Sequence, residues 1–243
     1  MGTVVSIELA DSRPESELSD LVDMTCSWLH EVDARFSTYK PDSEVCRFRR
    51  HEVALADTSD DFRHVLDRCA DLWRDTDGYF DAYAGGALDP SGYVKGWSVE
   101  VASQRLLAAG SRRHYINAGG DIRMRGAGPS GRPWRVGVRH PWEAGKLSWV
   151  LELTEGAVAT SGTYERGAHV FDPRTGKPAT GLRSVTVAGP DLAVADAYAT
   201  AALAMGEAGL AWLAKRVDEG YESAAVTDDG RAFTSPGLPI ALT

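Results

Sequence analysis

The sequence predicts an α+β fold: a largely antiparallel sheet with helices packed on its faces. Two observations support this class. In the first half of the chain, apolar residues recur with helical spacing, whereas from residue 113 onward they alternate with a period of two. The alternating segments are joined by short links, which connect antiparallel but not parallel neighbours. No linker, repeat or low-complexity tract interrupts residues 1–243, so we expect one domain.

The first half is predicted to hold one strand and three helices. The first helix should end shortly before Pro41, because proline cannot continue a helix. Ser59 or Asp60 can cap the second helix through its side-chain oxygen. The strand is expected at residues 3–9 and the helices at residues 18–36, from about 60 onward and 96–109.

The second half reads as a meander of strands followed by two helices and a last hairpin. Gly, Pro and Trp gather in the links at 126–133 and 140–146, as is typical of hairpin loops. The strands are expected at residues 113–118, 121–125, 134–139, 147–153, 156–160, 168–171 and 183–188. The helices are expected at 191–206 and 207–219, and the hairpin at 222–233.

Composition excludes several classes of protein. Apolar residues make up 43% of the chain and charged residues 25%, as in ordinary globular proteins. The net charge of −9 argues against a nucleic-acid surface, which would need a basic stripe. No apolar run is long enough to span a membrane and no signal peptide is visible. Three widely spaced cysteines form neither a zinc motif nor a disulfide framework, so we expect a cytoplasmic protein.

Asp196 and Thr200 are candidate ligands of a hard metal ion. In a helix, positions four apart lie on one face, one turn from each other. A carboxylate and a hydroxyl placed in this way suit Mg²⁺. The alternative is that Asp196 favours the first turn of a helix electrostatically and Thr200 is a surface residue. Spacing alone favours this alternative.

Other residues could bind an anionic ligand. His169 stands before an Asp-Pro turn, where it could accept a proton or be a half-buried ring with one satisfied nitrogen. The run from Asn117 to Asp121 contains two glycines that could let a phosphate or ribose approach the backbone, or simply form a turn. Lys95 is expected at the start of a helix, where an anion can bind. Tyr39 could stack on a flavin or fill the core. The chain has neither a Walker loop nor a G-x-G-x-x-G fingerprint.

Taken together, these stretches resemble the ApbE family, the FAD:protein FMN transferases, over nearly the whole chain. Each motif is weak alone, but their order and spacing are specific. The matching stretches are Met1–Thr3, Phe36–Tyr39 with Asp42–Glu44, Phe80–Asp81, Lys95–Gly96, Asn117–Asp121, Thr160–Gly162 with Tyr164, His169 with Asp172–Pro173 and Thr175–Gly176, and Asp196–Thr200.

The resemblance implies an activity and a set of site residues. Family members bind FAD and Mg²⁺, attach FMN through a phosphoester to a Thr or Ser of an acceptor protein, and release AMP. By motif, the magnesium ligands would be Asp196 and Thr200, with weaker candidates in the backbone carbonyls of Ala199 and Val94. His169 would activate the acceptor hydroxyl. The FAD-binding residues would be Met1, Tyr39, Asp81, Lys95, Asn117, Gly119, Gly120, Asp121, Thr160, Ser161 and Gly162.

One position departs from the family pattern. After Asp42–Glu44 the family usually has Ser-x-Leu-Asn, whereas this chain has Cys46-Arg47-Phe48-Arg49. Arg49 could pair with a phosphate of FAD or block part of the pocket. The sequence therefore leaves two alternatives to the transferase: a Mg²⁺-dependent pyrophosphatase that converts FAD to FMN and AMP, and a non-catalytic FAD-binding protein.

Overall fold

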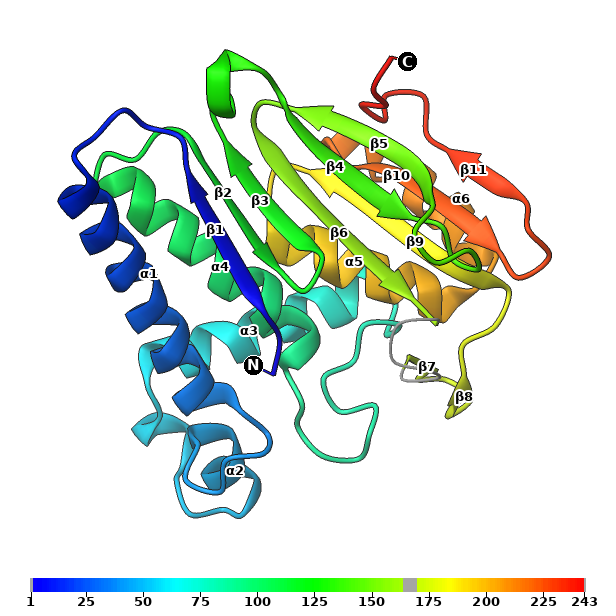
Figure 1. Cartoon of the computed structure of the whole chain (residues 1–243). Helices are drawn as coiled ribbons and strands as arrows, with labels where there is room; N and C mark the ends of the chain where they lie inside the picture. Colours follow the sequence, from blue (N-terminus) through cyan, green and yellow to red (C-terminus); the bar gives the residue numbers. More distant parts are fainter. Residues whose placement is uncertain (1, 164–169, 243) are drawn as a thin grey trace.

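The computed structural model describes residues 2–163 and 170–242 (Figure 1). Its centre is an antiparallel sheet with the strand order β1-β2-β3-β6-β9-β10-β11. The strands are β1 (Val5–Leu9), β2 (His114–Ala118), β3 (Asp121–Arg125), β6 (Gly156–Gly162), β9 (Leu182–Gly189), β10 (Glu222–Thr227) and β11 (Ala232–Thr234). The predicted α+β class is confirmed.

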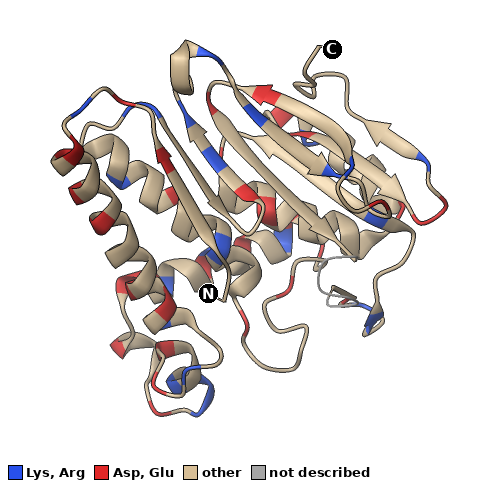
Figure 2. Ribbon diagram, in the orientation of Figure 1, with Lys and Arg blue, Asp and Glu red and all other residues tan. Residues whose placement is uncertain are grey.

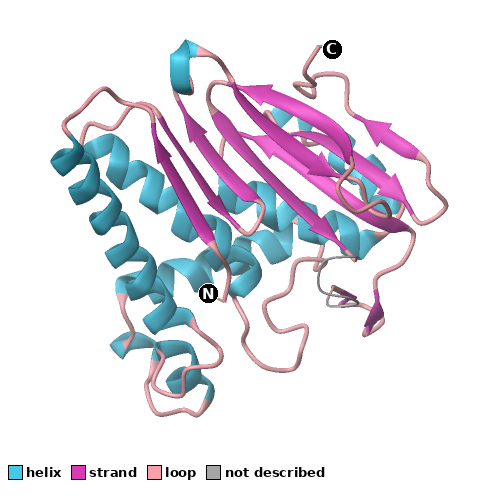
Figure 3. Cartoon of the chain, in the orientation of Figure 1, coloured by secondary structure: helices cyan, strands magenta, loops and turns pink. Residues whose placement is uncertain are grey.

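One face of this sheet is covered by a hairpin. Strands β4 (Trp134–Arg139) and β5 (Leu147–Leu153) leave the meander and pair with each other (Figure 3). Alternate residues of β4, from Trp134 to Val138, point inward, and they pack with Ile122, Met124 and Val158 of the main sheet. The strict alternation of β4 is therefore explained by a sheet-on-sheet contact.

Helices cover the opposite face. Helices α4 (Ser91–Ala108) and α5 (Leu192–Met205) pack against each other; α5 lies on β6 and β9, and α4 on β2 and β3. The other helices are α1 (Glu15–Phe36), α2 (Glu44–Arg49), α3 (Asp60–Asp75) and α6 (Ala208–Ala214), with short 3₁₀ turns at Leu55–Asp57, Pro129–Gly131 and Val217–Glu219. A two-stranded ribbon, β7 (Phe171–Asp172) and β8 (Lys177–Pro178), lies beside the end of β6 (Figure 1).

A local sequence signal explains where α3 begins, whereas α4 begins earlier than predicted. Ser59 Oγ accepts a hydrogen bond from the N–H of Phe62 at 3.2 Å, which confirms the predicted cap of α3. The helix predicted at 96–109 in fact begins at Ser91, immediately after Pro90, so that expectation was wrong by about one turn. Lys95 consequently lies inside α4 and not at its first residue, and an anion bound at this helix start stays a prediction.

A buried carboxylate joins the two helices to the sheet. Glu100 of α4 pairs with Arg123 Nε at 2.8 Å and with Arg125 Nη2 at 3.2 Å, and it accepts the N–H of Leu192 at 3.1 Å. Because Leu192 is the first residue of α5, Glu100 fixes the start of that helix against α4 and β3. Removing one partner would leave the other charges buried without compensation.

Most charged side chains lie on the outside of the molecule, and Figure 2 shows several Asp and Glu residues along α1. The exceptions are fully or almost fully buried and include Glu100, Asp121, Arg123 and Asp196, which come from α4, β3 and α5. Within the described ranges, none of the helices combines the length and apolar character needed to cross a membrane. The buried charges therefore mark the junction of α4, α5 and β3 as the place to look for chemistry.

Candidate functional site

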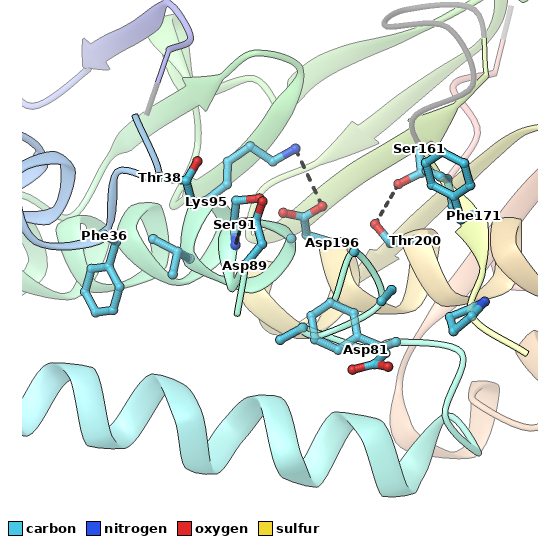
Figure 4. Close-up of a pocket in the computed structure, with 18 of the residues that line it drawn as sticks. Phe36, Thr38, Asp81, Asp89, Ser91, Lys95, Ser161, Phe171, Asp196 and Thr200 are labelled. Atoms are coloured by element: carbon cyan, nitrogen blue, oxygen red, sulfur yellow. Dashed lines mark hydrogen bonds and ion pairs between the residues drawn. The ribbon is translucent and has the colours of Figure 1, made fainter. Parts of the chain in front are cut away.

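A cavity of about 440 Å³ opens beside this junction (Figure 4). Its floor is formed by Lys95, Ser161, Asp196 and Thr200, with Asp121 behind them. Its rim consists of three short segments, at residues 36–39, 79–85 and 170–173, the last of which includes β7. The site thus combines side chains from regular elements with side chains from loops.

The floor contains two buried carboxylates and one lysine. The ammonium of Lys95 forms an ion pair with Asp121 and lies 3.6 Å from Asp196 Oδ1. Asp121 also accepts the N–H of Thr160 at 3.2 Å. One oxygen of Asp196, Oδ2, is buried without a hydrogen-bond partner in the part of the chain that the structure describes. That oxygen is the most conspicuous unsatisfied group of the floor.

Burial changes the ionisation of Asp196. Removal from water, together with the nearby Asp121 carboxylate, raises the pKa of Asp196 to about 7. The Lys95 ammonium and a backbone hydrogen bond from Gly96 act in the opposite direction, but they do not outweigh burial. A cation bound at Asp196 would favour the ionised carboxylate.

Hydroxyl groups complete the floor. Thr200 lies one helical turn after Asp196, and its Oγ1 is 3.1 Å from Ser161 Oγ at the end of β6 (Figure 4). Thr160 instead bonds to Thr186 of the neighbouring strand at 2.9 Å. The spacing that suggested one helical face therefore does bring Asp196 and Thr200 together, and β6 adds a second hydroxyl.

Small residues let the two helices approach closely enough to form this floor. A Cβ atom on Gly96 would lie 2.7 Å from the carbonyl oxygen of Leu192 and 2.8 Å from Ala193 Cα. Helix α5 is rich in alanine, which leaves room for the sheet below it. Glycine at position 96 thus allows Lys95 to reach the carboxylates of β3 and α5.

The turn between β2 and β3 is shaped by the Asn117–Asp121 run. Asn117 Oδ1 accepts the N–H of Gly120 at 2.8 Å. Gly119 has a φ of +63°, and a Cβ there would lie 2.3 Å from Thr3 Oγ1. Gly119 lines the cavity, whereas Asn117 holds the turn from behind.

An arginine ties two parts of the rim together. Arg174, on the turn between β7 and β8, donates to the carbonyl oxygen of Asp77 at 2.8 Å and pairs with its carboxylate at 2.5 Å. Its guanidinium also lies over the ring of Tyr79, 4.3 Å from the centroid. Tyr79 and Phe171 both line the cavity, so this contact sets the distance between two rim segments.

Arg49, the departure from the family pattern, contacts the loop after α3 and not the wall of the cavity. Its Nε donates to the carbonyl oxygen of Leu88 at 2.5 Å, and it is not among the residues that line the cavity. Leu88 directly precedes Asp89, which does line it. The structure thus gives Arg49 the role of anchoring the end of the loop after α3, and it supports neither a blocked pocket nor a phosphate contact.

The structure brings together most of the predicted site residues. Those that line the cavity are Tyr39, Asp81, Val94, Lys95, Gly119, Thr160, Ser161, Gly162, Asp196 and Thr200. Asn117, Gly120, Asp121 and Ala199 are not part of its wall. Met1 and His169 lie outside the described residues. Sequence reasoning did not assign Tyr79 or Phe171 to the site, although both are aromatic residues beside matching motifs; Pro173 was noted only as part of the Asp172–Pro173 motif.

The donors of the floor fit a small hard cation. Among the described residues there is no group of three or more His, Cys, Asp and Glu side chains that could enclose a metal ion. The site instead offers the open Asp196 Oδ2 and the hydroxyl of Thr200. Mg²⁺ is commonly held by one or two carboxylates and completes its shell with water and substrate phosphates. The floor therefore suits Mg²⁺ together with a phosphate-containing ligand.

An antiparallel sheet covered by helices, with a carboxylate-hydroxyl floor at their junction, places this chain among α+β proteins that have a cavity between sheet and helices. The chain belongs to the ApbE family, whose model matches residues 1–88 and 83–223.

Named relatives and solved structures agree with this family. The FAD:protein FMN transferase of Rhodobacter capsulatus is 38% identical over 164 residues, which are 64% of this chain and 31% of the relative. The Haemophilus influenzae protein of the same name is 25% identical, over 74% of this chain and 70% of the relative. The match to the FAD:protein FMN transferase of Vibrio cholerae covers 39% of that relative. The chain therefore spans about a third of the length of the Rhodobacter capsulatus and Vibrio cholerae proteins in these alignments.

Two solved structures share the fold over almost the whole chain. The ApbE protein of Thermotoga maritima superposes with a TM-score of 0.87 at 23% identity. The flavin transferase ApbE of Vibrio cholerae superposes with a TM-score of 0.82 at 25% identity. Both comparisons cover 97% of this chain and 94% of the other.

Proposed function

We propose that this protein is a Mg²⁺-dependent FAD:protein FMN transferase. It takes FAD as its substrate, transfers FMN to a Thr or Ser hydroxyl of an acceptor protein, and releases AMP. The observation that carries the proposal is the floor of the cavity, where the unpartnered Oδ2 of buried Asp196 lies one turn from Thr200 and beside Lys95. Its relatives bear the name of this activity.

In this proposal each part of the cavity has a task. Asp196 and Thr200 hold Mg²⁺, with the backbone carbonyls of Val94 and Ala199 as weaker candidate ligands. When bound there, Mg²⁺ would supply positive charge against the pyrophosphate. The Lys95 ammonium, held by Asp121, adds a fixed positive charge beside the phosphates.

The rim would hold the aromatic parts of FAD. Tyr39, Tyr79 and Phe171 line the cavity, and aromatic side chains stack on rings such as those of flavin or adenine. Gly119 and Gly162 allow the backbone to approach the ligand closely. The loops thereby orient the pyrophosphate over the floor, which lowers the entropic barrier of the transfer.

The transfer itself exchanges one phosphate bond for another. The acceptor oxygen forms a bond to the phosphorus of the FMN half, and the bond from that phosphorus to the bridging oxygen breaks. AMP leaves with the bridging oxygen. His169, which lies outside the described residues, is proposed to remove the proton from the acceptor hydroxyl.

Three cysteines without disulfide partners suit a reducing compartment such as the cytoplasm.

The test is to incubate the protein with FAD and Mg²⁺, with and without a threonine-containing peptide, and to follow AMP and the peptide mass. We expect AMP together with a peptide that has gained the mass of an FMN group. AMP without acceptor, at the same rate as with it, would identify a pyrophosphatase. FAD binding with no AMP in either sample would identify a flavin-binding protein. Omitting Mg²⁺ should stop the release of AMP.

A further inference from the structure

A second cavity, of about 490 Å³, adjoins the first. Its helical wall is one face of α3, where Leu66, Ala70 and Trp73 follow each other at intervals of four and three residues. Its opposite wall is the loop that includes Asp81 and Tyr83. The function proposed above gives this cavity no role.

Two aromatic rings at this cavity are exposed to solvent. Trp73 is 52% exposed and Tyr83 is 54% exposed, although large aromatic side chains usually bury most of their surface. Both line the same cavity. Aromatic residues that stand together at a hollow on the surface are typical of a place where a partner anchors a side chain.

The surroundings of the cavity are acidic. Asp67 lines it and Asp75 ends the same helix, and neither has a salt-bridge or hydrogen-bond partner among the residues that the structure describes. Arg74 also lines the cavity, and it pairs with Asp71, which Arg68 contacts as well at 2.8 Å. Four carboxylates, those of Asp67, Asp71, Asp75 and Asp81, therefore stand against two guanidinium groups. This local excess of negative charge favours a partner that carries Lys or Arg. It disfavours a nucleic acid, and a second copy of this chain, whose net charge is −9, is disfavoured as well.

The two cavities share a wall. Asp81 and Ala82 line both of them. Asp81 Oδ1 accepts the N–H of Tyr83 at 2.7 Å, which fixes this short segment between the two hollows. A polypeptide lying in the second cavity would pass directly beside the first one, as an acceptor must if its hydroxyl is to reach the phosphates.

We propose that this second cavity, the docking cavity, binds the acceptor polypeptide. An apolar side chain of the acceptor inserts between Trp73 and Tyr83, and a neighbouring Lys or Arg faces Asp67. The proposal rests on the transferase function proposed above and names how that enzyme recognises its protein substrate. It separates two tasks: the first cavity binds FAD, and the docking cavity presents the hydroxyl.

Binding can be measured without turnover. The probe is a fluorescent peptide with one threonine, one leucine and two lysines, and its dissociation constant is measured by anisotropy without FAD. We expect Trp73→Ala to raise this constant about tenfold. Asp67→Asn should raise it a few-fold at low salt and less at high salt. Phe233→Ala, an exposed aromatic on β11, and Asp20→Asn, an exposed carboxylate on α1, are matched controls that should leave it unchanged.

Two altered peptides test the chemistry of the partner. Replacing the leucine by serine, or the two lysines by glutamates, should weaken binding to the wild-type protein. The proposal is overturned if Trp73→Ala binds the original peptide as tightly as the wild type does. It is equally overturned if the glutamate peptide binds as tightly as the lysine peptide.

Turnover distinguishes failure of the docking proposal from failure of the transferase function. Trp73→Ala should raise KM for the peptide and leave KM for FAD unchanged. If the wild type transfers FMN and Trp73→Ala does so with the same peptide KM, only the docking proposal fails. If the wild type releases no AMP from FAD with or without peptide, the transferase function fails, and the acceptor role of the cavity fails with it.

Discussion

The floor and the rim of the first cavity hold their side chains in different ways. On the floor, Asp196 and Asp121 come from α5 and β3, are almost fully buried, and are fixed by Lys95 and by close helix packing. On the rim, Tyr39 comes from a loop and Phe171 from the two-residue strand β7, and both are exposed, Tyr39 to 94%. The floor thus holds charge where water is excluded, whereas the rim offers rings that can adjust to a ligand.

This difference indicates which changes the site tolerates. A buried charge on a rigid element interacts strongly with a bound ligand, because little solvent screens it. Its position is fixed, so no neighbouring side chain takes over its role when it is removed. An exposed ring on a loop contributes surface and shape, and each single contact is worth less. Substitutions in the floor should therefore have large effects on chemistry or folding, and those in the rim should have small effects on ligand affinity.

The largest effect is expected from Asp196→Asn. Because it removes the carboxylate proposed to hold Mg²⁺, the rate of AMP release from FAD should fall on the order of a thousandfold, or about 4 kcal/mol of transition-state stabilisation. Asp89→Asn, which removes a carboxylate that lines the cavity away from the floor, is the matched control and should change the rate only a few-fold. Equal rates for the wild type and Asp196→Asn would remove this carboxylate from the metal site.

Gly96→Ala should destabilise the fold. Its Cβ would meet the backbone of Leu192 and Ala193, which cannot move without shifting α5. The free energy of unfolding should fall by about 3 kcal/mol, as for other overpacked cores, and urea denaturation measures it. Gly85→Ala, on the rim, has no atom within 4 Å of its Cβ and should change stability by less than about 0.5 kcal/mol. If Gly96→Ala and Gly85→Ala lowered the free energy of unfolding by similar amounts, the contrast between a tightly packed floor and an open rim would be wrong.

Acid should loosen the helix that carries Lys95. His114 of β2 is fully buried against α4, with Nε2 2.8 Å from Ser103 Oγ. Burial, aided by Arg125, lowers the pKa of His114 to about 4. Above the unfolded pKa of about 6.5, His114 is neutral in both states, so it adds no pH dependence to the free energy of unfolding. Below that pH the unfolded chain takes up the proton more readily than the folded one. As the pH falls from there to about 4, stability should decrease by on the order of 3 kcal/mol.

Chemical denaturation at a series of pH values tests this prediction. His114→Gln should flatten the dependence in that window, whereas His64→Gln, an exposed histidine of α3, should leave it unchanged. A wild-type profile without an acid decline between pH 6.5 and 4 would show that His114 titrates normally in the folded protein.

The smallest effect is expected from Arg174→Met on the rim. Its ion pair with Asp77 is largely exposed and its contact with Tyr79 is a single cation–π interaction, so the midpoint of urea denaturation should hardly change. KM for FAD should rise a few-fold because two rim segments lose their link. Arg231→Met, which removes a comparable ion-pair and ring contact away from the cavity, should leave KM for FAD unchanged. A change in KM of equal size in both variants would refute the link.

Periodicity predicted most elements of the fold, but it misplaced one helix start with consequences for the site. The alternation of the second half and the helical spacing of α1, α3 and α5 were sufficient to place those elements. The start of α4 was missed because Ser91 to Val94 follows a loop rich in glycine and proline, where local signals favour a turn. That one error moved Lys95 from the interior of α4 to a helix start.

The candidate site was predictable where chemistry depends on spacing along one element. Asp196 and Thr200 are four residues apart in one helix, so their proximity follows from helical geometry. Tyr79, Phe171 and Arg174 were not predictable in this way, because their contacts join segments almost a hundred residues apart. Spacing in the sequence carries no information about such pairs.

By itself, the sequence determined the fold class, the family resemblance and the identity of the floor side chains, because periodicity and short motifs are properties of neighbouring residues. Only the tertiary structure decided which of them meet. It buried Asp196 beside Asp121 and Lys95, turned Arg49 toward Leu88, and placed the docking cavity beside the first one. These features arise from packing between distant elements, where burial and neighbouring charge together fix what a side chain can do.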